Sequence, residues 1–511
     1  MSSVPLLAQI QLGNTMIGEM AGDGYGRSMA LSADGKRVAG SAANNDANGS
    51  NSGHVRVHEY QVSTATWVQI GNDIDGGTAG EQLGFSVDLS GDGKRLVMLS
   101  PYYINNGYSA GKVKVFEELN GVWTQLGSSF IGQTTEQLHY DVAISRDGKR
   151  VAIGTKQNKV KVFEETNGFW TQVGTTLSGS GIFGFSLALS SDGKRIVVGS
   201  PNNNTASIGA GQTQIFEETN GVWTQVGAGI NGLINGDQSG YSVALSDNGK
   251  RVIIGAPYHQ ITMEKGHVRI FEESAGVWTQ IGAAIEGDNN YDGFGRCVGM
   301  SANGKRIIAT SIKNTTGGSN AGHAKIYEDN NGTWTQVGTI INGITQSRDG
   351  SSVAISADGH TVGLGATGFN STTGRVRVFG IPIAPTCIET RNIVNRYCKR
   401  RDYLLEPLRV VHTKEVVLEI SSQGTLPSGA VCTGGSGAWT HFNIKTEAFP
   451  ASGPMTTPVS QKTTNNIPVS SWYTLVGSNS SFYYLPNNAI ASMNQSITCL
   501  LYTSPSPRDR G

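Results

Sequence analysis

The chain is poor in charged residues and cysteine, and it has no long apolar run. Only 15% of its 511 residues are charged, against roughly 25% in an average domain, and 39 Lys and Arg balance 39 Asp and Glu. This balance gives no electrostatic reason to expect nucleic acid or an anionic membrane as a partner. No apolar run approaches the ~20 residues that cross a bilayer, so we expect no membrane span. The start of the chain also lacks the basic and apolar regions of a signal peptide.

Cysteine usage argues against a disulfide-stapled or zinc-stapled fold. Of the five cysteines, only Cys297 lies before residue 380, and the others are Cys387, Cys398, Cys432 and Cys499. None of them forms a C-x-x-C pair, so we predict no structural zinc site among them. One disulfide with a leftover thiol is possible in the later segment if the compartment is oxidising.

The chain is instead rich in glycine, with 69 residues, and in a repeated phrase that begins with tryptophan. The phrase is W-T-Q-x-G or W-V-Q-x-G, and its copies are 56, 47, 53, 55 and 56 residues apart. They begin at Trp67, Trp123, Trp170, Trp223, Trp278 and Trp334. Seven Asp-Gly or Asn-Gly turns recur with the same period, and each unit carries four segments in which apolar residues alternate. Four short strands per unit are typical of propeller blades.

The seventh copy of the phrase is missing at the end of the array and is found at the start of the chain. Gln11–Gly18 reads like Gln125–Gly132, whereas no such phrase follows Phe379. We therefore predict an all-β fold, a seven-bladed β-propeller of four-stranded blades over residues 1–380. The N-terminal strand Gln9–Gly13 would close it by forming the outermost strand of the last blade. The tryptophans should pack between blades.

Two further motifs resemble the FG-GAP repeat of integrin α chains and many microbial surface proteins. They are Phe183-Gly184 followed by Gly199-Ser200-Pro201, and Phe294-Gly295 or Ser239-Gly240 with Gly255-Ala256-Pro257 of the fifth unit. The resemblance covers about residues 1–380 and implies a seven-bladed propeller on an extracellular or cell-surface protein. The D-x-D-x-D-G calcium loop of integrin-type blades is absent from the turns between the first two strands. The nearest alternatives, Asp73–Gly76 and Asp288–Gly293, lie in other loops, so no cofactor is expected and calcium is only possible.

The two faces of the predicted ring differ in chemistry. We name the strands of a blade A to D. The hairpin face, with the A–B and C–D turns, carries a Lys-Arg pair in six blades, which serves either as solvated surface or as a dock for an anionic polymer. The loop face, with the B–C and D–A loops, has variable loops and five carboxylates before strand A. These candidate ligand residues are Asp23, Glu81, Glu136, Asp237 and Asp292. Each could instead cap its own turn.

No metal or catalytic residue is predicted. His54, His267 and His323 each open a strand C, but different blades separate them too far for a shared metal. The sequence has no H-E-x-x-H, G-x-S-x-G or P-loop motif.

After the ring, residues 381–386 read as a linker and residues 387–498 as a small β-rich domain, with strand-like runs such as 416–420 and 481–485. Residues 499–511 resemble the translation of a transposase-type sequencing adapter, which would exclude them from the fold.

The function favoured by these features is a non-enzymatic binding or adhesion module. It would be a monomeric ring that presents its loop face to a protein or glycan ligand. One alternative is a polysaccharide-active enzyme, a lyase or glycosidase, which a central funnel with two carboxylates beside an aromatic platform would favour. The other alternative is an intracellular scaffold.

Overall fold

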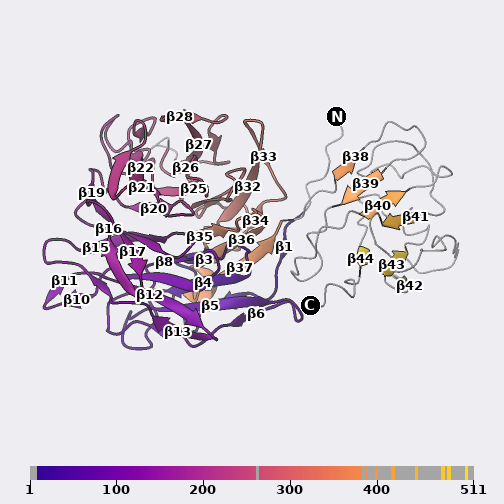
Figure 1. The fold of residues 1–511 in the computed structure, drawn as a ribbon, viewed down its shortest axis with the longest axis horizontal. Coiled ribbons are helices and arrows are strands. Elements are labelled where there is room, and N and C mark those ends of the chain that lie inside the picture. Colours follow the sequence, from indigo (N-terminus) through magenta and orange to yellow (C-terminus); the bar gives the residue numbers. More distant parts are fainter. Residues whose placement is uncertain are drawn as a thin grey trace. The chain divides into compact units, whose positions relative to one another are not determined.

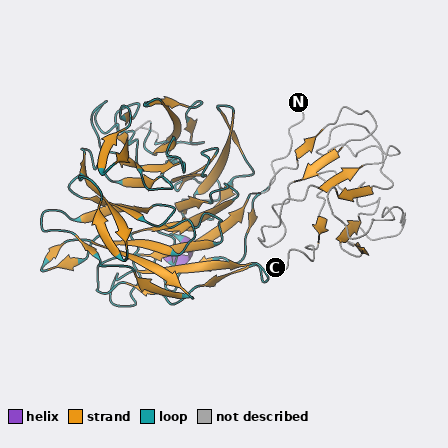
Figure 2. Ribbon diagram, in the orientation of Figure 1, coloured by secondary structure: helices purple, strands orange, loops and turns teal. Residues whose placement is uncertain are grey.

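The computed structural model describes residues 8–259 and 264–381 and, beyond them, only short strands. The chain divides into two compact units, residues 1–382 and 383–511. The first unit is a ring of seven antiparallel blades (Figure 1), and nearly all its regular structure is strand (Figure 2). The predicted fold class is therefore confirmed.

The blades follow one another along the chain, and each has strands A to D from the axis outward. Blade 1 is β3 (Met29–Leu31), β4 (Arg37–Ala42), β5 (His54–Gln61) and β6 (Thr66–Gln69); blade 2 is β8 (Ser86–Leu89), β9 (Arg95–Ser100), β12 (Lys112–Leu119) and β13 (Val122–Gln125); blade 3 is β15 (Leu138–Ile144), β16 (Arg150–Thr155), β17 (Lys159–Thr166) and β18 (Phe169–Gln172); blade 4 is β20 (Ser186–Leu189), β21 (Arg195–Ser200), β22 (Gln212–Thr219) and β23 (Val222–Gln225). Blade 5 is β25 (Ser242–Leu245), β26 (Arg251–Ala256), β27 (His267–Ser274) and β28 (Val277–Gln280); blade 6 is β30 (Val298–Met300), β31 (Arg306–Ser311), β32 (His323–Asn330) and β33 (Thr333–Gln336); blade 7 is β35 (Asp349–Ile355), β36 (Thr361–Ala366), β37 (Arg375–Gly380) and β1 (Ile10–Gln11).

A two-residue strand also pairs with the start of each strand C. These strands are β7 (Ile74–Asp75), β14 (Phe130–Ile131), β19 (Leu177–Ser178), β24 (Ile230–Asn231), β29 (Ile285–Glu286), β34 (Ile341–Asn342) and β2 (Met16–Ile17). The B–C loop of blade 2 adds a small hairpin, β10 (Ile104–Asn105) with β11 (Tyr108–Ser109), and that of blade 7 holds one helical turn, α1 (Phe369–Thr372).

The N-terminal strand closes the ring, as predicted. Ile10 and Gln11 of β1 pair with Gly380 and Phe379 of β37. The backbone N–H of Leu12 also donates to the carbonyl of Val378 at 2.8 Å. This pairing turns a linear array into a ring in which the first and last blades are joined by main-chain hydrogen bonds.

The tryptophans pack between blades and also join them by hydrogen bonds. The indole N–H of Trp123 donates to the carbonyl of Ile70, in the phrase of the preceding blade, at 3.1 Å. Each of the other five tryptophans repeats this bond at 2.8 to 3.0 Å. Blade 7 has Gln9 at this position, and its side-chain amide donates to the equivalent carbonyl of Val337 at 3.2 Å. The series of inter-blade bonds therefore continues around the whole ring.

The Lys-Arg pairs of the hairpin face have a role that the sequence did not reveal. Arg37 bonds Glu59 of its own blade at 3.0 Å and Glu118 of the next blade at 2.9 Å. Four later arginines make the same contact with the next blade, in the pairs Arg95–Glu165, Arg150–Glu218, Arg195–Glu273 and Arg251–Asp329. The arginines are thus mostly buried inter-blade clamps rather than solvated residues. Beside the other four arginines, Lys94, Lys149, Lys194 and Lys250 are exposed.

The FG-GAP-like glycines lie where two blades approach most closely. A Cβ on Gly255 would come within 2.1 Å of the carbonyl oxygen of Gly295 in the next blade. Gly199 meets Gly240 in the same way, also at 2.1 Å. These positions require glycine because a side chain would collide with the neighbouring backbone.

Beyond the ring, the described strands form two antiparallel sheets. The first holds β38 (Thr386–Ile388), β39 (Tyr397–Arg400), β40 (Val416–Glu419) and β41 (Asn443–Thr446), and the second holds β42 (Tyr473–Gly477), β43 (Ser480–Tyr484) and β44 (Leu501–Thr503). Strands β40 and β43 coincide with predicted strand-like runs. Most of residues 381–386, assigned to the linker, lie outside the described residues, but Ile381 is fully buried in the core of the ring. Strand β44 falls in the adapter-like segment, and residues 504–511 lie outside the described part.

Candidate ligand site at the mouth of the central channel

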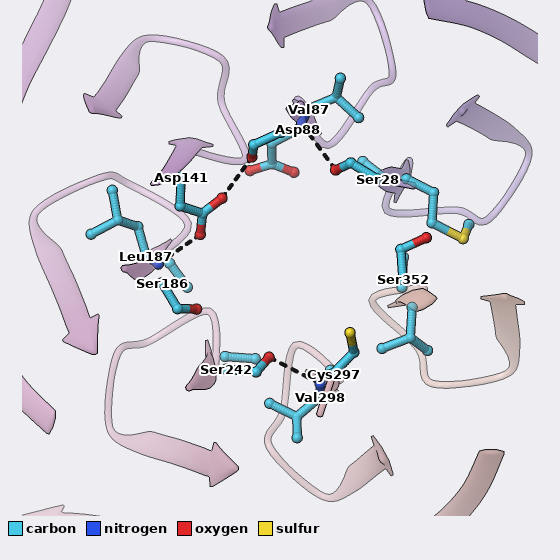
Figure 3. Close-up of a pocket in the computed structure, with 18 of the residues that line it drawn as sticks. Ser28, Val87, Asp88, Asp141, Ser186, Leu187, Ser242, Cys297, Val298 and Ser352 are labelled. Atoms are coloured by element: carbon cyan, nitrogen blue, oxygen red, sulfur yellow. Dashed lines mark hydrogen bonds between the residues drawn. The ribbon is translucent and has the colours of Figure 1, made fainter. Parts of the chain in front are cut away.

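A channel runs along the axis of the ring, lined by strand A of every blade (Figure 3). Its cavity measures about 760 Å³. Strand A is the inner edge of its blade, so some of its backbone N–H groups have no partner within the sheet. The channel wall is therefore built from edge strands whose polar groups must be satisfied by the neighbouring blade.

A ring of serines supplies these partners. Ser28 accepts a hydrogen bond from the backbone N–H of Val87 in the next blade at 3.0 Å, and Figure 3 draws this bond. Ser86, Ser186 and Ser242 accept equivalent bonds at 3.1 to 3.4 Å. Ser352 closes the series at the seam by donating to the carbonyl of Gly26 at 2.8 Å. The serines therefore fasten successive strands A around the axis.

Two carboxylates interrupt this pattern. Asp141 occupies the serine position of blade 3, where it accepts from Ser86 Oγ at 2.6 Å and from the backbone N–H of Leu187 at 2.8 Å. Asp88 of blade 2 accepts from the backbone N–H of Ile144 at 2.9 Å. Burial raises the pKa of Asp141 to about 6. Burial also raises the pKa of Asp88 to about 7, and the charge of nearby Asp141 adds to the effect.

An arc of aromatic rings lines the mouth of the channel on the loop face. Phe85, Phe185 and Tyr241 immediately precede strand A of their blades, and Tyr140 holds the same register position inside β15 of blade 3. The ring centroids of Tyr140 and Phe185 are 5.7 Å apart, and those of Phe185 and Tyr241 are 4.8 Å apart. His139 links the other end, 5.6 Å from Phe85 and 4.6 Å from Tyr140. All four aromatic residues are only half-buried, so their rings border the cavity rather than fill a core.

Arginines stand at both ends of this arc. The guanidinium of Arg27 lies 4.1 Å from the centre of the Phe85 ring, and that of Arg296 lies 4.6 Å from the centre of the Tyr241 ring. These are cation–π distances. Burial, with the nearby charge of Arg296 adding to it, lowers the pKa of Arg27. The exposed Arg348 also lines the cavity.

The variable B–C loops extend the site outward. Tyr102 from blade 2 stacks edge-on against Phe85 at 6.2 Å, and Tyr258 from blade 5 does so against Tyr241 at 6.0 Å. Lys156 and Lys313 lie 5.8 and 5.9 Å from the centres of these tyrosine rings. The mouth thus combines aromatic faces with positive charge.

The five candidate carboxylates of the loop face are buried instead of lining the mouth. Four of them accept hydrogen bonds from N–H or O–H groups three or four residues earlier in their own D–A loop, at 2.6 to 3.2 Å; these are Asp23, Glu81, Asp237 and Asp292. Glu81 also pairs with Lys112 at 3.0 Å, and Glu136 pairs with Lys161 at 2.6 Å. No two of the five share a partner in the described contacts. The structure thus gives four of them a role within their own loop and pairs Glu136 with strand β17, and ligand binding by them stays a prediction.

The three histidines that open a strand C fall into three separate groups in different blades. His54 lies near Glu19 and Asp73, His323 near Asp288 and Asp292, and His267 near Asp237 and His259. Both loops named as alternatives for calcium, around Asp73 and Asp288, thus lie beside a histidine. Asp288 already forms an ion pair with Lys325.

Sequence reasoning missed the aromatic arc, although a signal for it was present. Each of its members follows the glycine of the FG-like motif or, in Tyr140, the histidine that replaces it. A residue at this position begins the innermost strand and therefore faces the axis. Reading it in register across the blades gives Arg, Phe, Tyr, Phe, Tyr, Arg and Ser.

Comparisons with known proteins assign neither a family nor a function to this chain. No family model matches the chain, so membership of the FG-GAP family stays a prediction. No curated protein matches its sequence. Among solved structures, it is similar to a protein from Bacteroides uniformis that is provisionally assigned as a 6-phosphogluconolactonase. The identity is 16% and the TM-score 0.45, over 63% of this chain and 86% of that one. Within the described residues, no helix has the length and apolar character needed to cross a membrane.

Proposed function

We propose that this protein is a non-enzymatic binding module that holds an acidic carbohydrate chain at the mouth of its central channel. The observation that carries the proposal is the arc of four aromatic rings with an arginine stacked at each end. An extracellular or cell-surface setting, which the FG-GAP resemblance implies, would supply such a ligand.

The chemistry of the mouth suits a sugar that carries carboxylates or sulfates. The apolar C–H faces of a pyranose ring stack on aromatic side chains, which have large apolar faces at little entropic cost. Guanidinium groups bind carboxylate and sulfate oxygens with two parallel hydrogen bonds. The cavity of about 760 Å³ lies within the usual 300–1,000 Å³ of ligand pockets.

The shape of the site favours a glycan over a folded protein. The rings border a concave funnel at the axis, where a chain end can enter but a flat protein surface cannot reach. The variable B–C loops around the funnel would add selectivity for the linkage or length of the sugar chain.

The test is binding of uronic-acid oligosaccharides, for example oligogalacturonate and oligomannuronate, measured by calorimetry with dextran as the neutral comparison. We expect Phe185→Ala and Arg27→Ala each to weaken binding about 5-fold, because each contact is worth on the order of 1 kcal/mol. Phe169→Ala and Lys94→Ala are matched controls, since both residues are exposed on the hairpin face. The proposal would be contradicted if the control variants weakened binding as much as the mouth variants do. It would also be contradicted if the mouth variants bound the acidic chains as tightly as wild type. Capture of a protein or a single-stranded nucleic acid with no affinity for these sugars would also reject it.

A polysaccharide-active enzyme is a second candidate, favoured by Asp88 and Asp141. Both carboxylates lie in the same funnel as the aromatic arc, and both have a raised pKa, as a general acid requires. Against this role, both also hold backbone N–H groups of the neighbouring blade.

Activity on the same acidic chains separates the two candidates. New reducing ends would indicate a glycosidase, and absorbance from unsaturated uronate would indicate a lyase. An enzyme should lose this activity in Asp88→Ala and Asp141→Ser, whereas a binding module releases no product in any variant.

A further inference from the structure

One loop cluster on blade 5 combines two histidines and a carboxylate. His267 opens strand C, His259 lies in the preceding B–C loop, and Asp237 lies in the D–A loop that leads into the blade. One ligand atom from each residue lies within 4.8 Å of the other two. The two imidazole rings are 4.2 Å apart at 77°, and His259 Nδ1 lies 2.7 Å from Asp237 Oδ1.

His267 is a buried polar side chain without a partner. It is 1% exposed, and neither of its ring nitrogens forms a hydrogen bond. A neutral imidazole has one donor and one acceptor nitrogen, and leaving both unsatisfied in the interior costs stability. The ring nitrogens of His54 and His323, at the same position in two other blades, are also without a hydrogen-bond partner. Such an imidazole beside a buried carboxylate can bind a cation together with it.

In blade 2 the positions equivalent to His267 and Asp237 form an ion pair within the protein. There the residue that opens strand C is Lys112, and its Nζ lies 3.0 Å from Glu81, the equivalent of Asp237. The ammonium group supplies the positive charge that the buried carboxylate needs. In blade 5 this position holds the shorter His267, and the described contacts pair no lysine with Asp237.

We propose that Asp237, His259 and His267 bind a Zn²⁺ ion, or another late first-row divalent metal ion. Two imidazole nitrogens and one carboxylate oxygen are three ligands of a tetrahedral zinc site, and water would take the fourth position. The loop N–H groups that bond the other oxygen of Asp237, at 2.6 and 3.1 Å, hold its carboxylate in orientation.

The other two histidine groups lack this donor set. Each has a single histidine with two carboxylates, and in one of them Asp288 is already paired with Lys325. Among the described residues, the blade 5 group alone offers two nitrogen ligands to one ion.

A metal here would also anchor the loop next to the channel mouth. Tyr258 directly precedes His259. Its ring contacts Tyr241, and its hydroxyl accepts a hydrogen bond from Arg296 at 3.3 Å. The metal site itself is argued without reference to any ligand of the mouth, and the two can be tested separately.

The test uses the full chain with its cysteines alkylated and its metals removed with a chelator. It is titrated with Co²⁺, whose ligand-field absorption reports tetrahedral coordination, and then with Zn²⁺ in competition. We expect one equivalent of metal ion to bind. His259→Gln and His267→Gln should each weaken this binding by about 10-fold to 100-fold. His323→Gln is the matched control and should bind the same equivalent with unchanged affinity. Circular dichroism checks that each variant is folded.

Any of three results would overturn the proposal. The protein could give no tetrahedral Co²⁺ spectrum, folded His259→Gln could bind the metal as tightly as wild type, or His323→Gln could lose the bound metal ion. His259 is partly exposed and lies in a loop, so its variant remains informative even if His267→Gln fails to fold.

Discussion

Replacing Asp88 with alanine should remove a pH-dependent loss of folding stability. Five of the other six blades carry alanine at this position, in Ala30, Ala143, Ala188, Ala244 and Ala354, so the substitution introduces the residue that most blades use. In blade 2 the carboxylate faces the channel and has its pKa raised to about 7 by burial. The protein as it stands must therefore either protonate this group or hold its charge in a poorly solvated channel.

The sign and size of the effect follow from linkage. The folded-state pKa lies about three units above the ordinary value of 3.8, so the folded state holds a proton between about pH 4 and pH 7 that the unfolded state has lost. Stability therefore falls as the pH rises through this window. Three units correspond to about 4 kcal/mol, and water in the open channel reduces this to roughly 2 kcal/mol.

The assay is urea unfolding of wild type and Asp88→Ala at pH 4.5 and pH 8. Alanine also loses the hydrogen bond from Ile144, which favours the charged carboxylate and is therefore already included in the shifted pKa of Asp88. We expect the stability of the variant relative to wild type to improve by about 2 kcal/mol between pH 4.5 and pH 8.

The adjacent Val87→Ala is the control, because it removes a buried apolar side chain from the same strand without removing a titrating group, and its relative stability should not change with pH. A relative stability of Asp88→Ala that stays constant across the two pH values would refute the reasoning.

Three further predictions concern the contacts between blades. Deleting residues 1–13 should lower the free energy of unfolding by about 5 kcal/mol, because it removes the β1–β37 hydrogen bonds and the acceptor of the Trp67 indole; an unchanged urea midpoint would contradict ring closure. Arg150→Met should cost about 3 kcal/mol by leaving Glu218 unpaired, whereas the exposed Lys149→Met should change stability by less than about 0.5 kcal/mol; equal effects would dismiss the clamp. Gln9→Trp should raise stability by about 1 kcal/mol, since it restores the indole found at this position in the other six blades; a lower melting temperature would count against the equivalence.

The fold could be predicted from the sequence because its determinants are local and periodic. The Asp-Gly and Asn-Gly turns mark each A–B hairpin, and alternating apolar residues mark the strands between them. The split tryptophan phrase identified the closing strand, since only a ring can bring Gln11 beside Phe379. Repetition of one unit made each of these signals visible several times.

The site could not be predicted in the same way, because its residues come from different blades and lie together only around the central channel. Phe85 and Tyr241 are separated by three blade periods in sequence, yet they lie along one arc around the channel. The clamp partner of Arg37 is likewise a blade away, at Glu118. The carboxylates of the D–A loops were predicted as ligand residues because they recur in five blades. Recurrence in a repeat protein reflects the needs of the repeat, and each of them is buried in its own loop or beside it.

The departures from the repeat are more informative about function than the repeat itself. The arginines at either end of the arc and the second histidine of blade 5 each occur at positions where other blades differ. Such differences cannot be explained by the packing that all blades share.

The most direct test of the proposed function is a crystal structure of the protein with a uronic-acid oligosaccharide. We expect a sugar ring stacked on Phe185 or Tyr241, with its carboxylate against Arg27 or Arg296. An oligosaccharide bound elsewhere on the ring, with the channel mouth unoccupied at saturating concentration, would contradict it.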